Sequence, residues 1–411
     1  MPHTLDVLDS PCLYLSPMSK PRLTVVVLGH AGAGKSALVD RLTGAPEKAV
    51  PTVDCRVRAL GSALTLLDAP GRRSLAKSAI AATSQADAAL LVVPAAVGAF
   101  ETAYAKSGQL REQALVTYAL GVTQLVVAVN QMDHETVAFD PTRFLEIKQE
   151  LAAFLTKIGF KEGVAFVPVS ARQGDHVTER SAQMPWHTGG TLVQALEALA
   201  PPARPSPALP LRFSVHKVHQ IKEVGTVVVG RVVSGTLRVG MTVAFAPRTD
   251  SAVVQSIEVH RKRVDSAEPG DYVGVHVQGA HARRGMVMID DSPLRPVVSF
   301  EAQILVLDHP GRLVAGYTPV LHAHAAHAAC RVTKLLKLLN KRTGEAMQAV
   351  PPTSLQIGQM ALCELVPVQP TLCVETFAAC APLGRFVLRD LRRIVAVGVV
   401  KAIRYDTSSS P

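Results

Sequence analysis

The sequence predicts an α/β phosphate-loop (P-loop) domain with a doubly wound, mainly parallel sheet, followed by two antiparallel β-barrel domains. Apolar runs alternate with helix-like patterns as far as about residue 200. Short β-like runs separated by turn residues fill the second half of the chain. A glycine-rich stretch, GHAGAGKS (29–36), connects the first apolar run to the first helical pattern. Strand–helix alternation is typical of a parallel α/β sheet, and closely spaced short strands are typical of barrels.

The apolar runs of the first half are nearly uninterrupted, as in strands that are buried on both faces of a parallel sheet. The predicted strands are residues 23–29, 64–70, 88–94, 124–130 and 164–170. Apolar residues at helical spacing predict helices at 107–121, 141–159 and 191–200, and the glycine-rich loop opens a helix at 35–43.

Two proline-rich segments, PPARPSPALP (201–210) and DDSPLRPVVSF (290–300), are expected to interrupt regular structure. The first separates the α/β part from the strand-rich half, and the second divides that half into two parts. The sequence therefore predicts an N-terminal extension at 1–17, a nucleotide-binding domain at 18–204, and β-barrel domains at 205–295 and 296–406.

The composition is that of a folded protein without membrane spans. Apolar residues make up 48% of the 411 residues and charged residues 18%, and no apolar run reaches the ~20 residues that a spanning helix needs. The first 17 residues contain no Lys or Arg, unlike a secretory or mitochondrial leader. Six scattered cysteines form no C-x-x-C pair, which favours a reducing compartment. We expect a cytoplasmic monomer that does not bind membranes.

The net charge of +10 is concentrated in the second half of the chain. Residues 1–205 contain 19 basic and 18 acidic residues, whereas residues 206–411 contain 24 and 15. A basic half joined to a neutral half indicates a polyanion partner, of which nucleic acid is the most common, although a basic surface can also serve solubility alone.

The stretch GHAGAGKS fits the phosphate-loop pattern G-x-x-x-x-G-K-S and lies between a strand and a helix, as the motif requires. The backbone N–H groups of such a loop surround phosphates at a helix N-terminus. Lys35 is expected to neutralise the outer phosphates, and the Ser36 hydroxyl to coordinate Mg²⁺. The predicted phosphate-binding residues are Gly29, His30, Ala31, Gly32, Ala33, Gly34, Lys35, Ser36 and Ala37.

Three further motifs follow predicted strands. In DAPG, Asp68 is expected to anchor Mg²⁺ from the outer coordination sphere, and the Gly71 amide to sense a γ-phosphate. In NQMD, Asn130 and Asp133 suit a guanine base, because the carboxylate accepts hydrogen bonds from ring N1–H and the exocyclic amine. In SAR, the backbone amides of Ser170, Ala171 and Arg172 are placed to hold the guanine O6. In this order, the motifs predict GTP and GDP as ligands.

With these motifs the sequence resembles the translational GTPases, most closely eukaryotic elongation factor 1-alpha, from about Met18 to the end of the chain. Segments that carry the resemblance beyond the motifs include MPWHTGGTLVQALE (184–197), VGTVVVGRVVSGTLRVGM (224–241) and PLGRFVLRDLRRIVAVGVVKAI (382–403). The resemblance implies a GTPase domain and two β-barrels that grip aminoacyl-tRNA and deliver it to the ribosome. It also allows a guanine nucleotide exchange factor as a partner.

Arg72 departs from this family at the residue that orients the attacking water. The family has DAPGH, whereas this chain has DAPGR. An arginine keeps its proton and offers the water no acceptor, so we expect slow hydrolysis. The alternative makes Arg72 an arginine finger supplied in cis. The predicted catalytic residues are therefore Lys35, Gly71 and Arg72.

Two other departures lie in the nucleotide site. The family has a long helical insertion in its first switch, but here only 15 residues separate Ser36 from Thr52, which we predict to be the Mg²⁺- and γ-phosphate-sensing threonine. Gln131 replaces the Lys of the family's N-K-x-D motif, which predicts weaker nucleotide binding. The predicted metal-binding residues are Ser36, Thr52 and Asp68.

The histidines of HAHAAH (322–327) have no carboxylate nearby in the sequence, so we expect structural histidines on strands in preference to a zinc site. Two functions remain open. One is an elongation-factor-like GTPase acting on aminoacyl-tRNA at the ribosome. The other is a GTP-binding adaptor with little or no hydrolysis, acting in mRNA surveillance or another translation-linked role, which Arg72 and the short first switch favour.

Overall fold

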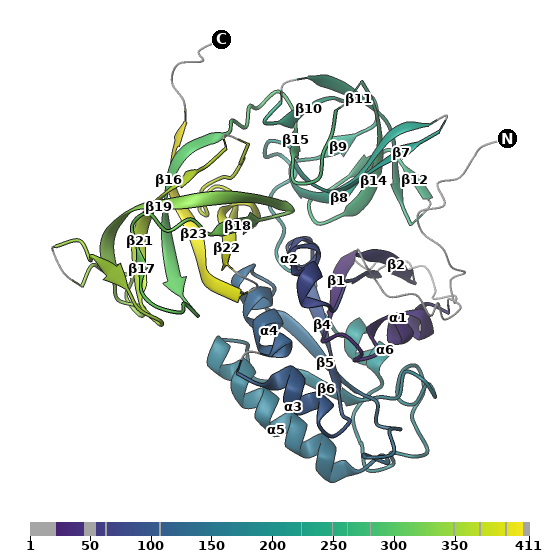
Figure 1. Cartoon of the computed structure of the whole chain (residues 1–411). Coiled ribbons are helices and arrows are strands. Elements are labelled where there is room, and N and C mark those ends of the chain that lie inside the picture. The colour runs from purple at the N-terminus through teal and green to yellow at the C-terminus, as the bar shows by residue number, and fades with distance from the viewer. Residues whose placement is uncertain are drawn as a thin grey trace. The chain divides into compact units, whose positions relative to one another are not determined.

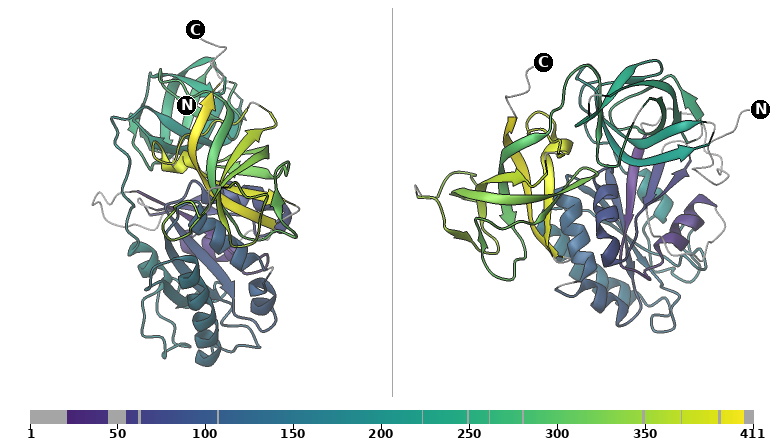
Figure 2. Two further views of the ribbon diagram at one scale, coloured as in Figure 1. Left: turned by 90° about the vertical axis from the view of Figure 1, so that its left-hand side faces the viewer. Right: turned by 45° about the horizontal axis from the view of Figure 1, so that its top comes forward.

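A computed structural model of the chain describes residues 22–44, 55–61, 64–106, 108–222, 224–248, 250–260, 262–279, 281–347, 350–369, 371–390 and 393–405 (Figure 1). The chain separates into two compact units. Unit 1 comprises Met1–Tyr118 and Val122–Ala203, and unit 2 comprises Ala119–Gly121 and Arg204–Pro411. The views in Figure 2 show helices packed around a sheet in unit 1 and strands wound into rings in unit 2.

Unit 1 is built on a six-stranded sheet in the order β2-β3-β1-β4-β5-β6. Its strands are β1 (Leu23–Leu28), β2 (Arg56–Leu60), β3 (Leu64–Asp68), β4 (Ala88–Pro94), β5 (Gln124–Asn130) and β6 (Ala165–Pro168). All neighbours pair in parallel except β2, which runs antiparallel to β3 at one edge. β1 pairs in parallel with both β3 and β4, so the loops after β1 and β3 lie at the same end of the sheet.

Helices cover both faces of this sheet. They are α1 (Lys35–Thr43), α2 (Ala76–Thr83), α3 (Ala99–Tyr104), α4 (Gln109–Ala119), α5 (Pro141–Ile158) and α6 (Leu192–Glu197), with a short 3₁₀ turn η1 (Arg73–Leu75) before α2. Leu38 and Leu42 of α1 and Leu196 of α6 share one core cluster with the central strands. Figure 1 shows α4 and α5 on the opposite face. Among the described residues, no helix has both the length and the apolar character that crossing a membrane requires.

The first ring of unit 2 contains strands β7 to β15. They are β7 (Arg212–Ile221), β8 (Gly225–Ser234), β9 (Leu237–Arg238), β10 (Thr242–Ala246), β11 (Ser251–Val259), β12 (Lys262–Val264), β13 (Ser266–Ala267), β14 (Tyr272–Gln278) and β15 (Val287–Ile289). Seven of them form an antiparallel sheet, and the extra β10–β11 pairing closes it into a ring around an apolar core that includes Phe213 and Ile257.

The second ring is a closed barrel in the order β16-β21-β19-β18-β22-β23. Its elements are β16 (Val297–Val306), β17 (Leu313–Val314), β18 (Val320–Ala323), β19 (Ala326–Leu339), β20 (Ser354–Leu355), β21 (Met360–Pro367), α7 (Ala381–Gly384), β22 (Arg385–Asp390) and β23 (Arg393–Tyr405). Buried and partly buried residues alternate along β21, as in a strand with one face toward the core. In the core, the ring of Phe300 packs edge-on against that of Phe386.

The predicted fold class is confirmed. Strands 88–94 and 124–130 and helix 35–43 begin and end where the pattern places them, and the other predicted elements of unit 1 are shorter by one to four residues. The second proline-rich segment lies between β15 and β16, and its last residues, from Val297, belong to β16. Its proline at 296 lies just before the strand, where a missing N–H costs no ladder hydrogen bond. The boundaries of the three domains stay predictions.

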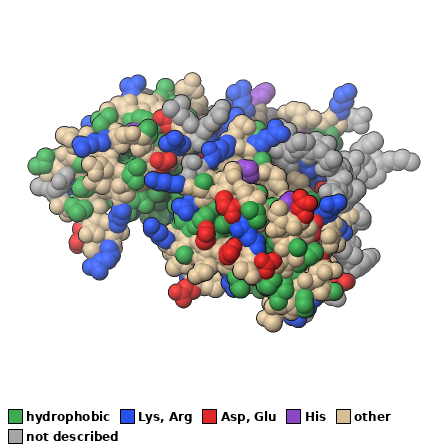
Figure 3. Space-filling view, turned by 60° about the horizontal axis from the view of Figure 1, so that its bottom comes forward, with side chains coloured by type: hydrophobic (Ala, Val, Ile, Leu, Met, Phe, Trp, Pro, Cys, Tyr) green, Lys and Arg blue, Asp and Glu red, His purple; other side chains and the backbone are tan. Residues whose placement is uncertain are grey.

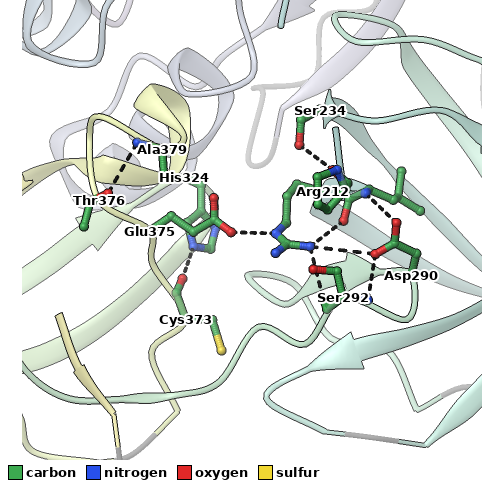
Figure 4. Close-up of polar contacts among 11 residues, drawn as sticks. Arg212, Ser234, Asp290, Ser292, His324, Cys373, Glu375, Thr376 and Ala379 are labelled. Carbon is green, nitrogen blue, oxygen red and sulfur yellow. Dashed lines mark hydrogen bonds and ion pairs between the residues drawn. The ribbon is translucent and has the colours of Figure 1, made fainter. Parts of the chain in front are cut away.

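The two rings of unit 2 meet around Arg212, the first residue of β7 (Figure 4). Its side chain is 8% exposed and forms an ion pair with Glu375, with a distance of 2.7 Å from Nε to Oε1. Its other end donates to the backbone oxygens of Leu211 and Ser292. An apolar cluster that includes Val287 of the first ring and Leu383 of α7 adjoins this ion pair. The rings are therefore joined by both a buried charge pair and apolar packing.

Candidate nucleotide site

The predicted phosphate loop lies between β1 and α1, at the carboxyl end of the sheet. Gly34 is the residue before α1 and has left-handed φ and ψ of 84° and 20°. A Cβ at this position would lie 2.3 Å from Nδ2 of Asn130, so both the conformation and the close approach require glycine. The loop thus brings the backbone N–H groups at the N-terminus of α1 to one place, as anion binding requires.

Lys35 is the first residue of α1, and its side chain turns back over the loop. Its ammonium donates hydrogen bonds to the carbonyl oxygens of Gly29, at 2.8 Å, and of His30, at 2.9 Å. Burial lowers the pKa of the Lys35 ammonium to about 8, and the charge of Asp68 opposes the shift. A buried cation of this kind is stabilised by an anion, so the loop is electrostatically suited to phosphate.

Ser36 and Asp68 come from different elements and meet beside the loop. The Ser36 hydroxyl donates to Oδ2 of Asp68 at 2.9 Å, and Asp68 is buried at the end of β3. A hydroxyl and a carboxylate are the hard oxygen donors that Mg²⁺ prefers, and Mg²⁺ is commonly held by few protein groups together with phosphates and water. The residues present therefore fit this ion. Thr52, the third predicted metal-binding residue, lies outside the described residues.

The segment after β3 lies against the phosphate loop. Gly71 is buried, and a Cβ there would lie 2.2 Å from Nζ of Lys35 and 2.9 Å from the backbone nitrogen of Ala31. Any larger residue would push this segment away from the loop. Its backbone therefore lies directly beside the ammonium of Lys35 and the phosphate loop, and its role in sensing a γ-phosphate stays a prediction.

Arg72 follows Gly71 and is exposed, in an extended conformation that precedes η1. Across the described ranges, its side chain makes no hydrogen bond or ion pair. The guanidinium is therefore attached to the segment beside the phosphate loop without being fixed to a protein partner.

The base-binding motifs converge through Asn130 at the end of β5. Its Nδ2 donates to the backbone oxygen of Ala33 at 2.8 Å, and its Oδ1 accepts from the N–H of Ala171 at 2.9 Å. One side chain thereby joins the phosphate loop to the SAR turn. Nε2 of Gln131 donates to the backbone oxygen of Gly32 at 3.0 Å, so Gln131 reaches the loop without bringing a charge.

The remaining base-binding residues lie in the turns that follow β5 and β6. Asp133 is half-buried in the first of them. In the second, the Ser170 hydroxyl accepts from the N–H of Gln173 at 3.0 Å, which shapes the SAR turn. The predicted residues of NQMD and SAR are thus brought together, and their contacts with a guanine base stay a prediction.

Sequence reasoning missed Arg41, on the last turn of α1. Its guanidinium donates to the backbone oxygens of Ala171, at 3.3 Å, and Arg172, at 2.6 Å. The SAR turn is therefore held both by Asn130 and by the phosphate-loop helix. The only signal in the sequence was a basic residue near the C-terminus of a helix, which usually serves the helix dipole.

His322 lies on β18 and His327 on β19, where they face each other across the ladder. His324 lies in the turn between the two strands, so the predicted strand location is wrong for this histidine. His324 is buried, its Nε2 lies 3.0 Å from the oxygen of Cys373, and burial lowers its pKa to about 4. Within the described ranges, no group of three or more His, Cys, Asp or Glu side chains could hold a metal ion. The Cys373 contact accounts for His324 as a structural residue.

Family models match three successive parts of the chain. The model "Elongation factor Tu GTP binding domain" matches residues 49–202, "Elongation factor Tu domain 2" matches 225–289, and "GTP-eEF1A C-terminal domain-like" matches 299–401. The phosphate loop precedes the first matched range, so its assignment rests on its motif and geometry.

Whole-length relatives and solved structures extend the match. The chain is 40% identical over 429 aligned positions to elongation factor 1-alpha 1 of Euplotes crassus, covering 94% of this chain and 96% of the relative. It is 39% identical to elongation factor 1-alpha of Entamoeba histolytica, covering 94% and 97%.

Two solved structures share the fold. The elongation factor SelB of Methanococcus maripaludis, in complex with the GTP analogue GppNHp, has a TM-score of 0.74 at 20% identity, covering 94% of this chain and 80% of that one. The GTPase-like domain of Ski7 from S. cerevisiae, bound to GTP, also scores 0.74, at 15% identity, covering 92% and 97%. The identity over nearly the whole length, together with the three matched domain models, shows that this chain belongs to the elongation factor 1-alpha family of translational GTPases.

Proposed function

We propose that this protein binds Mg²⁺·GTP at the phosphate loop, carries aminoacyl-tRNA to the ribosome and hydrolyses GTP slowly. The observation that carries the slow hydrolysis is the position of Arg72. It directly follows Gly71, whose backbone packs against Lys35, and its guanidinium has only donors to offer.

Nucleotide binding follows from the residues around the loop. The loop N–H groups and the Lys35 ammonium bind the phosphates, and Asp133 with the SAR turn reads the guanine base. Ser36, Asp68 and Thr52 would hold Mg²⁺, which when bound neutralises phosphate charge. Asn130 sets the distance between the phosphate and base parts of the site.

Hydrolysis requires a water in line with the γ-phosphate. Lys35 and the Gly71 amide stabilise the charge that develops on the phosphate. The water needs an acceptor to orient it, and Arg72 provides none, so the missing group should cost about 10²–10⁴ in rate. The presence of Arg72 should leave GTP binding unaffected, because the groups that bind the phosphates are all present.

The test is the variant Arg72→His, which restores the family residue. We expect single-turnover hydrolysis with ribosomes to become at least ~10²-fold faster, within the range that a positioned group of this kind contributes. GTP affinity should stay within a few-fold. Arg73→His is the matched control, one residue farther along, and should leave the rate unchanged.

Two outcomes would contradict the proposal. A slower Arg72→His variant would show that Arg72 acts as an arginine finger in cis. If neither the wild type nor the variant hydrolyses GTP even with ribosomes, the second candidate is favoured, a GTP-binding adaptor in mRNA surveillance or another translation-linked role.

The tRNA part of the proposal rests on the charge of the second half, 24 basic against 15 acidic residues. Figure 3 shows Lys and Arg side chains spread over the visible face and many of its acidic side chains grouped near the middle. If four phosphates are neutralised, counterion release predicts that the affinity of the full-length GTP complex for aminoacyl-tRNA falls roughly 10²-fold between 50 and 200 mM salt. Filter binding at several salt concentrations measures this slope, and a flat response would exclude the electrostatic argument.

A guanine nucleotide exchange factor would fit the same proposal, since family members with two nucleotide states need release of GDP between cycles. We expect the protein to act as a cytoplasmic monomer.

A further inference from the structure

A hollow of about 800 Å³ lies beside the edge strand of unit 1, and none of the residues that line it is a predicted nucleotide-site residue. It is bounded by α5, β6, the segment 186–190 and α6. Its lining includes Phe144, Lys148, Phe166, Trp186 and His187.

The strand that borders the hollow has one side without a neighbour. β6 is the last strand of the sheet and, within the described residues, pairs only with β5. The N–H of Val169 donates to the oxygen of Val129 in β5, and successive residues of a strand point their N–H and C=O groups to opposite sides. The N–H and C=O of Phe166 therefore point away from β5.

The end of this edge shows where pairing must stop. Pro168 lies two residues after Phe166, so its backbone also faces away from β5, and proline has no N–H to donate there. An added strand would therefore pair with β6 over a short stretch around Phe166. Unpaired strand edges of this kind are templates for another chain.

The wall opposite the strand is aromatic and basic. The ring of Phe144 lies 5.5 Å from that of Trp186 and 5.8 Å from that of His187, measured between centroids. Burial is the main cause that lowers the pKa of His187, and the positive charges of Lys148 and Arg180 lower it further. None of the described residues that line the hollow is Asp or Glu. The hollow thus combines apolar surface with the positive charge of Lys148.

We propose that this hollow binds an extended, acidic segment of a partner protein, which adds as a short strand to β6 and directs a carboxylate toward Lys148. The outward-pointing N–H and C=O of Phe166 supply backbone hydrogen bonds, as in strand addition. Phe144 and Trp186 cover an apolar side chain of the segment, and Lys148 selects against basic segments.

Trp186 is the only tryptophan of the chain, so its fluorescence reports directly on the hollow. The probe is an acetylated pentapeptide amide of alternating Val and Asp, titrated into the full-length protein. Two control peptides have Lys in place of Asp, or an N-methyl group on the central backbone nitrogen. We expect a saturable change with the acidic peptide and at least tenfold weaker binding of both controls.

Protein variants test the same contacts. Lys148→Glu reverses an exposed charge and should weaken binding of the acidic peptide about fivefold. Lys157→Glu, on the same helix but outside the hollow, is the matched control and should change it less than twofold. GDP affinity should be unchanged in both variants, which shows that they remain folded.

Several results would overturn the proposal. The absence of a saturable change up to millimolar peptide would exclude the site. Equal binding of the Lys peptide would remove the argument from charge. Equal binding of the N-methylated peptide would exclude strand addition, and an equal response to inorganic phosphate would indicate a plain anion site.

Discussion

Lys35 shows how a single buried charge can be prepared for a ligand. Its ammonium is buried among backbone oxygens of the phosphate loop, so the pKa of Lys35 is lowered to about 8. Arg72, in contrast, is exposed and extended, although it is attached to a segment that touches the same loop. Under the proposed function, the site keeps the residue expected to bind phosphate and changes the residue at the water-orienting position.

The lowered pKa of Lys35 predicts a pH dependence of nucleotide binding. Phosphate raises the pKa of a neighbouring ammonium, so binding takes up a proton wherever free Lys35 has lost it. Nucleotide affinity is therefore full below pH 8 and falls as the pH rises above 8, by at most about tenfold per pH unit. A fluorescent GDP analogue titrated between pH 7 and 9 measures the fall.

Lys35→Arg is the control for this prediction, because its charge persists throughout the range. Comparing its pH profile with that of the wild type removes any titration of the nucleotide itself. Equal pH slopes in the two proteins would mean that Lys35 stays charged in the free protein.

At the level of elements, α1 does more than present the phosphate loop. Through Arg41 its last turn holds the backbone oxygens of Ala171 and Arg172, while Asn130 holds the other side of the SAR turn. The phosphate and base parts of the site are therefore linked by two separate elements.

Arg41→Ala should release both GDP and GTP faster, because two charge-assisted hydrogen bonds to the SAR turn are lost. We expect a change of about tenfold, since exposure to solvent reduces the free energy that these bonds contribute. Stopped-flow release of a fluorescent nucleotide measures both rates. Arg41→Lys should fall in between, since one ammonium can replace one of the bonds. Lys157→Ala, exposed on α5, is the control, and release rates equal to the wild type in Arg41→Ala would show that Asn130 holds the turn alone.

The elements that sequence reasoning missed are short or lie at an edge. α2 and α3 have eight and six residues, and their runs of small residues lack a clear helical period. β2 is only partly buried at the sheet edge, so its pattern is not continuously apolar. Long helices such as α5 were predicted well, because four buried residues spaced along 18 give an unambiguous period.

Over the whole molecule, the buried Arg212–Glu375 ion pair joins the two rings of unit 2 (Figure 4). The residues lie 163 positions apart in the sequence. Because the guanidinium is almost fully buried, its charge must be compensated in the folded state.

Glu375→Ala should destabilise the protein by about 3 kcal/mol, since it leaves the Arg212 charge buried without its nearest carboxylate. Urea unfolding of the full chain measures the change. Glu345→Ala, at an exposed position, should change stability by less than about 0.5 kcal/mol. A loss equally small for Glu375→Ala would show that Asp290, 4.0 Å from the guanidinium, compensates the charge by itself.

The sequence alone determined the fold class, the family and the positions of the nucleotide motifs, because these depend on local patterns: continuous apolar runs, helical periods and a glycine-rich loop between strand and helix. Only the tertiary structure decided how the motifs are joined. The Asn130 bridge, the Arg41 contacts, the Arg212 ion pair and the open edge of β6 each bring together or expose residues that are far apart in the chain. Such contacts depend on the packing of whole elements, and no local pattern specifies them.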